Sequence, residues 1–186
     1  MSERLYQFRF GEDFKAVQRV DVTPKNFQGL PYPDRTQEPS SAIHQVGRFV
    51  REAAASYQIT SPIEAARYLM ENIYTPFVQF DQEELWALLL NTKNYVTHEV
   101  MIYRGTVNSA LIRAPEIFKE AIRVNATAII LSHCHPSGDA TPSPEDVQVT
   151  KRIREIASLI EIEVEDHIVI GKDAWVSLKD RGLGFD

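Results

Sequence analysis

Hydrophobic residues recur along the chain at two periods, and each period predicts one kind of element. Apolar positions at helical spacing predict helices over Ser40–Tyr57 and Pro115–Asn125, and further helices that begin at Ser61 and near Pro144. Five shorter apolar runs predict strands, which cover Leu85–Leu90, Tyr95–Tyr103, Ala126–Ser132, Ile162–Ile170 and Ala174–Leu178. Because helices and strands are interleaved, we expect an α/β or α+β fold with a mixed sheet.

Local signals sharpen several of these elements. The sequence Ser61-Pro62-Ile63-Glu64 offers an N-cap, a first-turn proline and a capping box. The turn at residues 91–94 predicts an antiparallel hairpin between the first two strands. The apolar stripes predict the buried faces of three helices: Ile63, Ala66, Met70 and Ile73; Ile117, Phe118, Ala121 and Ile122; and Val149, Ile153, Ile156 and Ile160.

The start of the chain differs in composition from the rest. The whole chain has 186 residues, which is about one domain at the usual ~100–200 residues per domain. The stretch Thr23–Ser40 is rich in proline, glycine and polar residues and predicts an extended loop. We therefore divide the chain into an N-terminal extension over residues 1–58, with a Pro-rich loop and a helix, and a domain over residues 59–186.

Composition and charge narrow the compartment and the partners. The single cysteine, Cys134, excludes an intrachain disulfide framework and fits a reducing cytosol. No apolar run approaches the ~18–20 residues of a membrane helix, and the first residues lack a secretory signal. The net charge is −6, and residues 61–186 carry 12 basic and 19 acidic residues. We therefore expect a cytoplasmic protein that binds nucleic acid weakly or not at all.

The candidate chemistry lies where the third predicted strand ends. His133 and His135 stand two residues apart at that point, and imidazole nitrogens are common ligands for zinc. Asp146, in the first turn of the next predicted helix, can supply a third ligand and leave a fourth position for water. Asp139 is an alternative third ligand. Ser143 and Asp146 are also explained as the N-cap and capping box of that helix.

Other metal signatures do not fit these residues. The metallo-β-lactamase pattern HxHxDH fails at its last two positions, and the zincin motif HExxH is absent. A zinc deaminase needs further cysteines, and one cysteine cannot supply them. An amidohydrolase barrel needs roughly 200 residues or more of parallel βα repeats.

One pattern does fit. His133-x-His135, followed after seven residues by Ser143 and after two more by Asp146, resembles the JAMM (MPN, JAB-type) metalloprotease motif at every fixed position. The segments HPSGDATPSPED, residues 98–133 and residues 166–183 resemble the RadC branch of that superfamily. The resemblance covers about residues 59–183 and implies a cytidine-deaminase-like domain with a mixed, curved sheet flanked by helices. Residues 1–60 lack the helix-hairpin-helix module that RadC proteins commonly carry, and Cys134 replaces the usual Asn or Ser between the histidines.

The resemblance also implies roles for individual residues. His133, His135 and Asp146 would hold Zn²⁺, Glu99 on an earlier strand would act as general base, and the Ser143 hydroxyl would stabilise the oxyanion. The implied activity is hydrolysis of peptide or isopeptide bonds in a peptide or protein substrate.

Two alternatives to a hydrolase remain open at this stage. One is an adaptor in DNA repair or mobile-element biology, and the other is a metal-free relative without activity. The acidic balance of residues 61–186 speaks against direct DNA binding by that part of the chain. The presence of all five motif residues counts against a metal-free relative. His98, His167 and His44 have no companions at ligand spacing, and Cys134 is expected to point away from the metal as a small buried residue.

Overall fold

The computed structural model describes residues 6–10, 16–21, 49–53, 56–105 and 113–186. Within these ranges, six strands form one mixed sheet in the order β3-β5-β4-β6-β7-β8. The strands are β3 (Phe49–Glu52), β4 (Glu84–Leu90), β5 (Val96–Arg104), β6 (Ala128–Cys134), β7 (Glu163–Ile170) and β8 (Trp175–Ser177). Neighbouring strands are antiparallel except β6 and β7, which are parallel. The expected mixed sheet and the hairpin of β4 and β5 are therefore confirmed.

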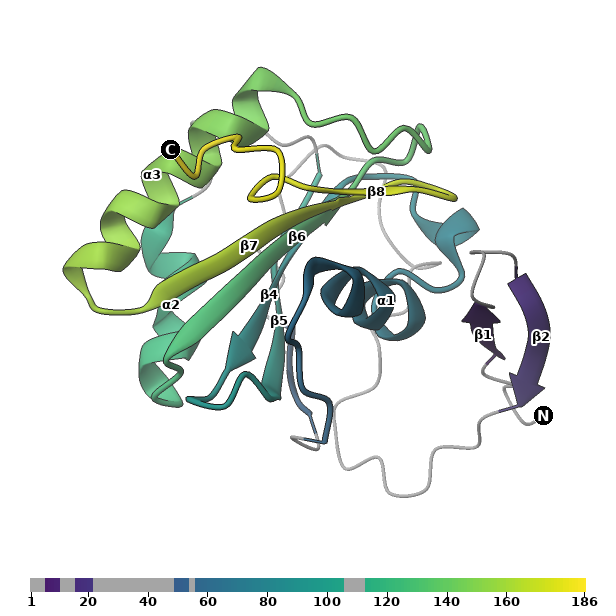
Figure 1. The fold of residues 1–186 in the computed structure, drawn as a ribbon, viewed down its shortest axis with the longest axis horizontal. Helices are drawn as coiled ribbons and strands as arrows, with labels where there is room; N and C mark the ends of the chain where they lie inside the picture. Colours follow the sequence, from purple (N-terminus) through teal and green to yellow (C-terminus); the bar gives the residue numbers. More distant parts are fainter. Residues whose placement is uncertain (1–5, 11–15, 22–48, 54–55, 106–112) are drawn as a thin grey trace.

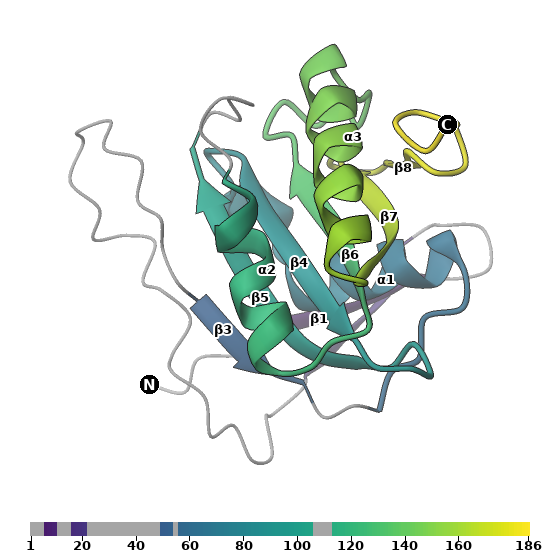
Figure 2. The ribbon, with the colours of Figure 1, turned by 90° about the vertical axis from the view of Figure 1, so that its left-hand side faces the viewer.

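Three α-helices in the described ranges cover the two faces of the sheet. They are α1 (Pro62–Asn72), α2 (Ala114–Arg123) and α3 (Pro144–Leu159), and a short 3₁₀ helix, η1 (Phe77–Gln79), follows α1. Figures 1 and 2 show α1 on one face and α2 and α3 on the other. Helix α3 supplies the crossover that the parallel pair β6 and β7 requires. None of the helices described is long and apolar enough to cross a membrane.

Each face of the sheet buries its own hydrophobic cluster. The cluster under α1 includes Leu69, Trp86, Leu88 and Ile130. The cluster under α2 and α3 includes Ile117, Ile129, Leu131 and Ile153. Every residue of β4 and of β6 is buried, as expected for central strands that are covered on both faces. A polar side chain in β6 is therefore held in a rigid and largely dry environment.

The helix predicted over Ser40–Tyr57 is wrong in its described part, because residues 49–52 form the edge strand β3. Val50 of β3 lies opposite Val100 of β5. The backbone groups along this side of β5 need hydrogen-bond partners, and this tertiary demand overrides the local helical spacing. The sheet thus includes residues that precede position 59. Residues 40–48 of the predicted helix lie outside the described residues.

The extension contains two strands that the sequence pattern did not predict. They are β1 (Tyr6–Phe10) and β2 (Ala16–Asp21), and they pair antiparallel as a separate two-stranded sheet. The predicted Pro-rich loop over Thr23–Ser40 lies outside the described residues.

The helical stripes are correct near the middle of each helix and less so toward its ends. Ile122 is 56% exposed, and Ile63 and Ile160 are 38% exposed, although all three were predicted to be buried. These residues lie in the first or last turn of their helices or just beyond, where the helix no longer covers the sheet. The capping box predicted at Ser61 is also absent, because the Glu64 carboxylate accepts hydrogen bonds from the backbone and hydroxyl of Thr60 instead.

The packing of α3 against the sheet can be tested with a matched pair of variants. Ile153 is 1% exposed in the middle of α3, whereas Leu159 at its end is 83% exposed. We expect Ile153→Ala to lower the free energy of unfolding by about 2–5 kcal/mol, because it leaves a cavity in the core. Leu159→Ala should change it by less than about 0.5 kcal/mol. Chemical denaturation measures both, and equal losses would contradict the described packing of α3.

Candidate metal centre

Two histidines and one aspartate meet at the C-terminal end of β6. His133 is the penultimate residue of β6, His135 follows the strand, and Asp146 lies in the first turn of α3. The Nε2 atom of His133 lies 3.0 Å from Nε2 of His135 and 3.2 Å from Oδ1 of Asp146. The Nε2 atom of His135 lies 3.7 Å from Oδ2 of Asp146. In the described part of the chain, these residues form the only group of three that could hold a metal ion. The structure therefore brings together the three predicted ligands.

The spacing of the donor atoms fits a tetrahedral zinc ion. Zinc bonds of about 2.0–2.2 Å to nitrogen and oxygen imply donor atoms about 3.3–3.5 Å apart in a tetrahedral site. The separations of 3.0, 3.2 and 3.7 Å scatter around that value. The side chains of His133 and Asp146 are 1% and 3% exposed, whereas that of His135 is 15% exposed. The cluster is therefore accessible to solvent from the side of His135.

The loop after β6 orients His135 through a backbone carbonyl. The Nδ1 atom of His135 lies 2.8 Å from the carbonyl oxygen of Asp139. Because a carbonyl can only accept, the proton is on Nδ1 and the lone pair on Nε2 points toward the cluster. The Asp139 carboxylate accepts from the backbone and hydroxyl of Thr141 at 2.9 and 2.7 Å. The alternative of Asp139 as a ligand is therefore wrong, since its side chain is used within the loop.

The same loop rests on the turn between β7 and β8. The backbone N–H of Lys172 donates to the carbonyl of Gly138 at 3.1 Å, and that of His135 donates to Ile170 at 2.9 Å. Gly138 has a φ of +88°, and a Cβ atom at Gly171 would lie 2.3 Å from the Gly138 oxygen. Glycine at both positions therefore permits the close backbone contact that holds His135.

Asp146 is held by the N-terminal cap of α3. Its Oδ2 atom accepts from the backbone N–H and the hydroxyl of Ser143, both at 2.7 Å, and the Ser143 oxygen accepts from the backbone of Asp146. Burial alone would raise the pKa of Asp146, but the adjacent imidazoles of His133 and His135 and the hydrogen bonds from Ser143 hold that pKa well below its usual range. The carboxylate is therefore charged, and its Oδ1 atom faces His133. In this arrangement the hydroxyl proton of Ser143 is committed to Asp146.

A second buried histidine lies behind His133. The Nδ1 atom of His133 is 2.8 Å from Nε2 of His167, and Nδ1 of His167 is 2.6 Å from the hydroxyl of Thr150. Complete burial is the main cause that lowers the pKa of His167 to about 3, so this ring is neutral. Spacing along the chain cannot reveal this contact, because His167 lies on β7 and Thr150 on α3.

The structure does not bring Glu99 to the cluster. Glu99 pairs with Leu88, and Leu88 pairs with Ile130, three residues before His133 along β6. Its carboxylate accepts from the hydroxyl of Tyr68 of α1 at 2.6 Å and forms an ion pair with Arg51 of β3.

The contact of Glu99 with α1 places it on the opposite face of the sheet from His133, because His133 shares its face of β6 with Ile129 and Leu131, which pack under α2 and α3. The predicted role of Glu99 beside the metal ligands therefore has to be corrected.

A different glutamate lies next to the cluster. Leu85 of β4 is opposite His133, and Glu83 lies two residues earlier, directly before β4, so strand alternation places it on the face of His133. Its charge acts on His135. The adjacent Asp146 carboxylate is the main cause that raises the pKa of His135, and the charge of Glu83 adds to it. Glu83 is partly buried. The acidic pair Glu83-Glu84 directly before the apolar run Leu85–Leu90 was the sequence signal that could have identified it.

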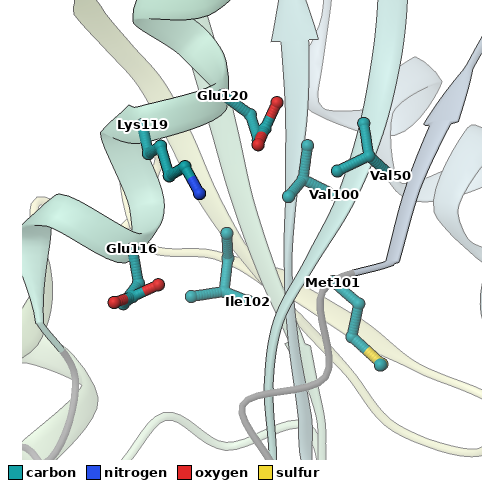
Figure 3. A pocket seen from close by; sticks show the side chains of 7 residues that line it. All are labelled: Val50, Val100, Met101, Ile102, Glu116, Lys119 and Glu120. Carbon is teal, nitrogen blue, oxygen red and sulfur yellow. The ribbon is translucent and has the colours of Figure 1, made fainter.

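The remaining candidates take no part in the cluster. Cys134 is buried in the α1 cluster, on the far side of β6 from His133, which agrees with its expected role as a small buried residue. His98 contacts the Thr97 hydroxyl at 3.1 Å. Figure 3 shows Glu116 and Glu120 of α2 over a pocket that β5 and β3 complete. This pocket has a volume of only about 20 Å³, room for about one water. His44 lies outside the described residues.

Comparisons with known proteins agree with this arrangement. A family model described as "RadC-like JAB domain" matches residues 59–183. A UPF0758 protein of Chloroflexus aggregans is 45% identical over 78% of this chain and 62% of its own length. A UPF0758 protein of Bacillus cereus strain AH187 is 44% identical over 92% of this chain and 82% of its own length. The chain thus spans about three fifths of the length of the Chloroflexus relative.

Removing a ligand tests the metal centre. We expect the wild-type chain to bind close to one zinc ion and to gain thermal stability from it, by about 2.7 kcal/mol at a zinc concentration 100 times the dissociation constant. His133→Ala should weaken zinc binding by more than about 100-fold, because loss of a ligand costs more affinity than loss of a residue that only hydrogen-bonds to a ligand. His98→Ala is the matched control and should bind as the wild type does. Elemental analysis and thermal unfolding with and without zinc measure these effects, and a wild type that neither contains nor takes up zinc would contradict the assignment.

Proposed function

The chain belongs to the RadC-like JAB domain family, and from that premise we propose that it is a zinc-dependent hydrolase of peptide or isopeptide bonds. One observation carries the proposal, which is the convergence of two imidazole Nε2 atoms and a carboxylate oxygen at a partly exposed strand end. A structural zinc site is usually closed by four protein ligands, whereas three ligands leave a position for chemistry. His133, His135 and Asp146 would hold the ion.

The donor set favours zinc among the common ions. Two imidazoles and one carboxylate are typical ligands of catalytic zinc, whereas magnesium and calcium prefer oxygen ligands throughout. When bound, zinc supplies Lewis-acid chemistry that activates water at neutral pH.

Glu83 is the residue that we assign as general base. Its carboxylate lies on the same face of the sheet as His133 and close enough to influence the charge of His135. It can therefore take the proton of the attacking water and deliver it to the leaving amine. Its neighbour Glu84 is less suited, because it is buried and accepts a hydrogen bond from the Trp86 indole at 3.0 Å.

Ser143 has a positioning role in this mechanism. Its hydroxyl and backbone hold one oxygen of Asp146, which turns the other oxygen toward His133. Stabilisation of the oxyanion by Ser143 stays a prediction, because it requires the hydroxyl to leave Asp146 during the reaction.

The substrate class rests on the family resemblance and on the geometry of approach. His135 and Glu83 are partly exposed where β6 ends and β4 begins, so a substrate would approach the cluster from this side. A peptide or protein partner therefore suits the site better than a small molecule, which normally occupies an enclosed pocket.

The assignment of the base is tested with two glutamate variants. We expect Glu83→Gln to keep zinc and to lower hydrolysis of a peptide or isopeptide library by roughly 10²–10⁴-fold, because glutamine cannot accept the proton. Glu99→Gln should keep hydrolysis within a few fold and lower the free energy of unfolding by about 1–3 kcal/mol, because it weakens the buried contact with Arg51. The reverse pattern, with Glu99→Gln inactive and Glu83→Gln fully active, would return the role of base to Glu99.

Binding of DNA separates the hydrolase from the adaptor alternative. Residues 61–186 have seven more acidic than basic residues, so we expect no duplex binding tighter than about 1 μM at physiological salt. Titration of the full chain against labelled duplexes of different sequence measures this. Submicromolar binding would favour a role as a DNA-associated adaptor.

A further inference from the structure

We propose that Thr150 and His167 are positioning residues that fix the proton of His133 on Nδ1 and so keep its Nε2 atom free to bind the metal. The proposal rests on the proposed function for the role of His133 as a ligand, but the placement of the proton can be judged from the metal-free protein alone. Three consecutive hydrogen bonds carry the argument.

We call the three hydrogen bonds that link Asp146, Thr150, His167 and His133 the relay. Which atom donates in each of them is decided at Thr150. The Thr150 hydroxyl lies 2.7 Å from the backbone carbonyl of Asp146, one turn earlier in α3. A carbonyl oxygen can only accept, so the single hydroxyl proton of Thr150 is used in this bond. The hydroxyl oxygen must therefore accept, and not donate, in its other short contact.

That other contact is to His167. With 2.6 Å between Nδ1 of His167 and the Thr150 oxygen, the proton of this bond has to come from His167. A neutral imidazole carries one proton only, so Nε2 of His167 is an acceptor. The His167 ring is fully buried, so water does not reach it to move the proton from Nδ1 to Nε2 at low cost.

The last bond passes this choice on to His133. Its Nδ1 atom lies 2.8 Å from Nε2 of His167, and since that nitrogen accepts, the Nδ1 of His133 must carry a proton. The lone pair of His133 is then on Nε2, which faces His135 and Asp146. The tautomer that a metal needs at Nε2 is thus selected before any metal arrives.

Among the residues that the structure describes, no other group is hydrogen-bonded to the ring of His167. The adjacent carboxylate, Asp166, is turned toward β8, where it accepts from the Ser177 hydroxyl at 2.6 Å. It also accepts from the backbone of His167 at 2.7 Å and of Lys179 at 3.2 Å. The imidazole of His167 therefore has Thr150 and His133 as its hydrogen-bond partners.

The relay also joins two of the ligands to each other. It begins at the backbone of Asp146 and ends at the ring of His133, so a shift of the first turn of α3 against β7 would disturb both at once. This connection makes the metal affinity sensitive to a residue, Thr150, that lies behind the cluster.

Thr150→Val tests the relay with little change in shape. Valine keeps the branched side chain but removes the oxygen, whereas Thr150→Ser keeps the hydroxyl and is the matched control. In metal-free wild type at alkaline pH, where the imidazoles are neutral, long-range ¹H–¹⁵N correlation NMR should find the His133 proton on Nδ1. In Thr150→Val we expect a mixture of tautomers at His133 and about 10–100-fold weaker zinc binding. Thr150→Ser should match the wild type, and His135, oriented by Asp139, should keep its tautomer in all three proteins.

The inference and the proposed function fail in different ways. A proton on Nε2 of His133 in metal-free wild type, or unchanged tautomers in Thr150→Val, would overturn the inference whatever the activity. Absence of hydrolysis with the tautomers as expected would overturn the proposed function and leave the relay in place. A Thr150→Val protein that loses zinc affinity while His133 keeps its proton on Nδ1 would also count against the relay, because the loss would then have another structural cause.

Discussion

Helix α3 packs across the sheet through Val149, Ile153 and Ala157, and this apolar contact sets the place of its first turn relative to the end of β6. Asp146 lies in that turn, and its Oδ1 atom is 3.2 Å from Nε2 of His133. Neither histidine moves freely either, since β6 is hydrogen-bonded on both sides by β4 and β7. The metal site therefore depends on the docking of one helix on two central strands, and the capping box of Ser143 then sets the orientation of the carboxylate within it.

Such a site is unfavourable to the protein without a cation. Two imidazole lone pairs and a charged carboxylate face one another in a place that is almost closed to water, and polar groups that lack a partner there cost free energy. The surrounding apolar packing has to offset that cost, and a bound ion would remove it and so raise the free energy of unfolding. The same argument explains why the neighbouring contacts are so complete. Each ligand has its remaining polar atoms committed to a carbonyl, a hydroxyl or a second ring, so none can turn away to reduce the repulsion.

Local sequence patterns were sufficient for most of the fold, since the strands β4 to β8 and the helices α1 to α3 follow from apolar periodicity. For the candidate metal centre, spacing indicated His133 and His135 and left Asp146 and Asp139 as alternatives, and the resemblance to the JAMM motif implied Asp146. The edge strand β3 could not be predicted in this way, because its conformation comes from pairing with β5, a strand some fifty residues away in the chain. His167 was equally out of reach, because its importance lies in contacts to two other elements.

Glu99 and Glu83 differ in environment more than in chemistry. Both precede the histidines in sequence, Glu99 on β5 and Glu83 directly before β4, and only the register of β4, β5 and β6, together with the face of the sheet, tells them apart. Burial raises the pKa of Glu99, and the adjacent Arg51 opposes that effect. The carboxylate also accepts a buried hydrogen bond from the Tyr68 hydroxyl. A group in such a contact cannot accept a proton from water without breaking it. Glu83 is partly exposed beside the open side of the cluster, where water and a leaving group can both reach it. Because a base must exchange its proton with the substrate in each cycle, this difference in access is the reason that we propose Glu83, and not Glu99, as the base of the proposed hydrolysis.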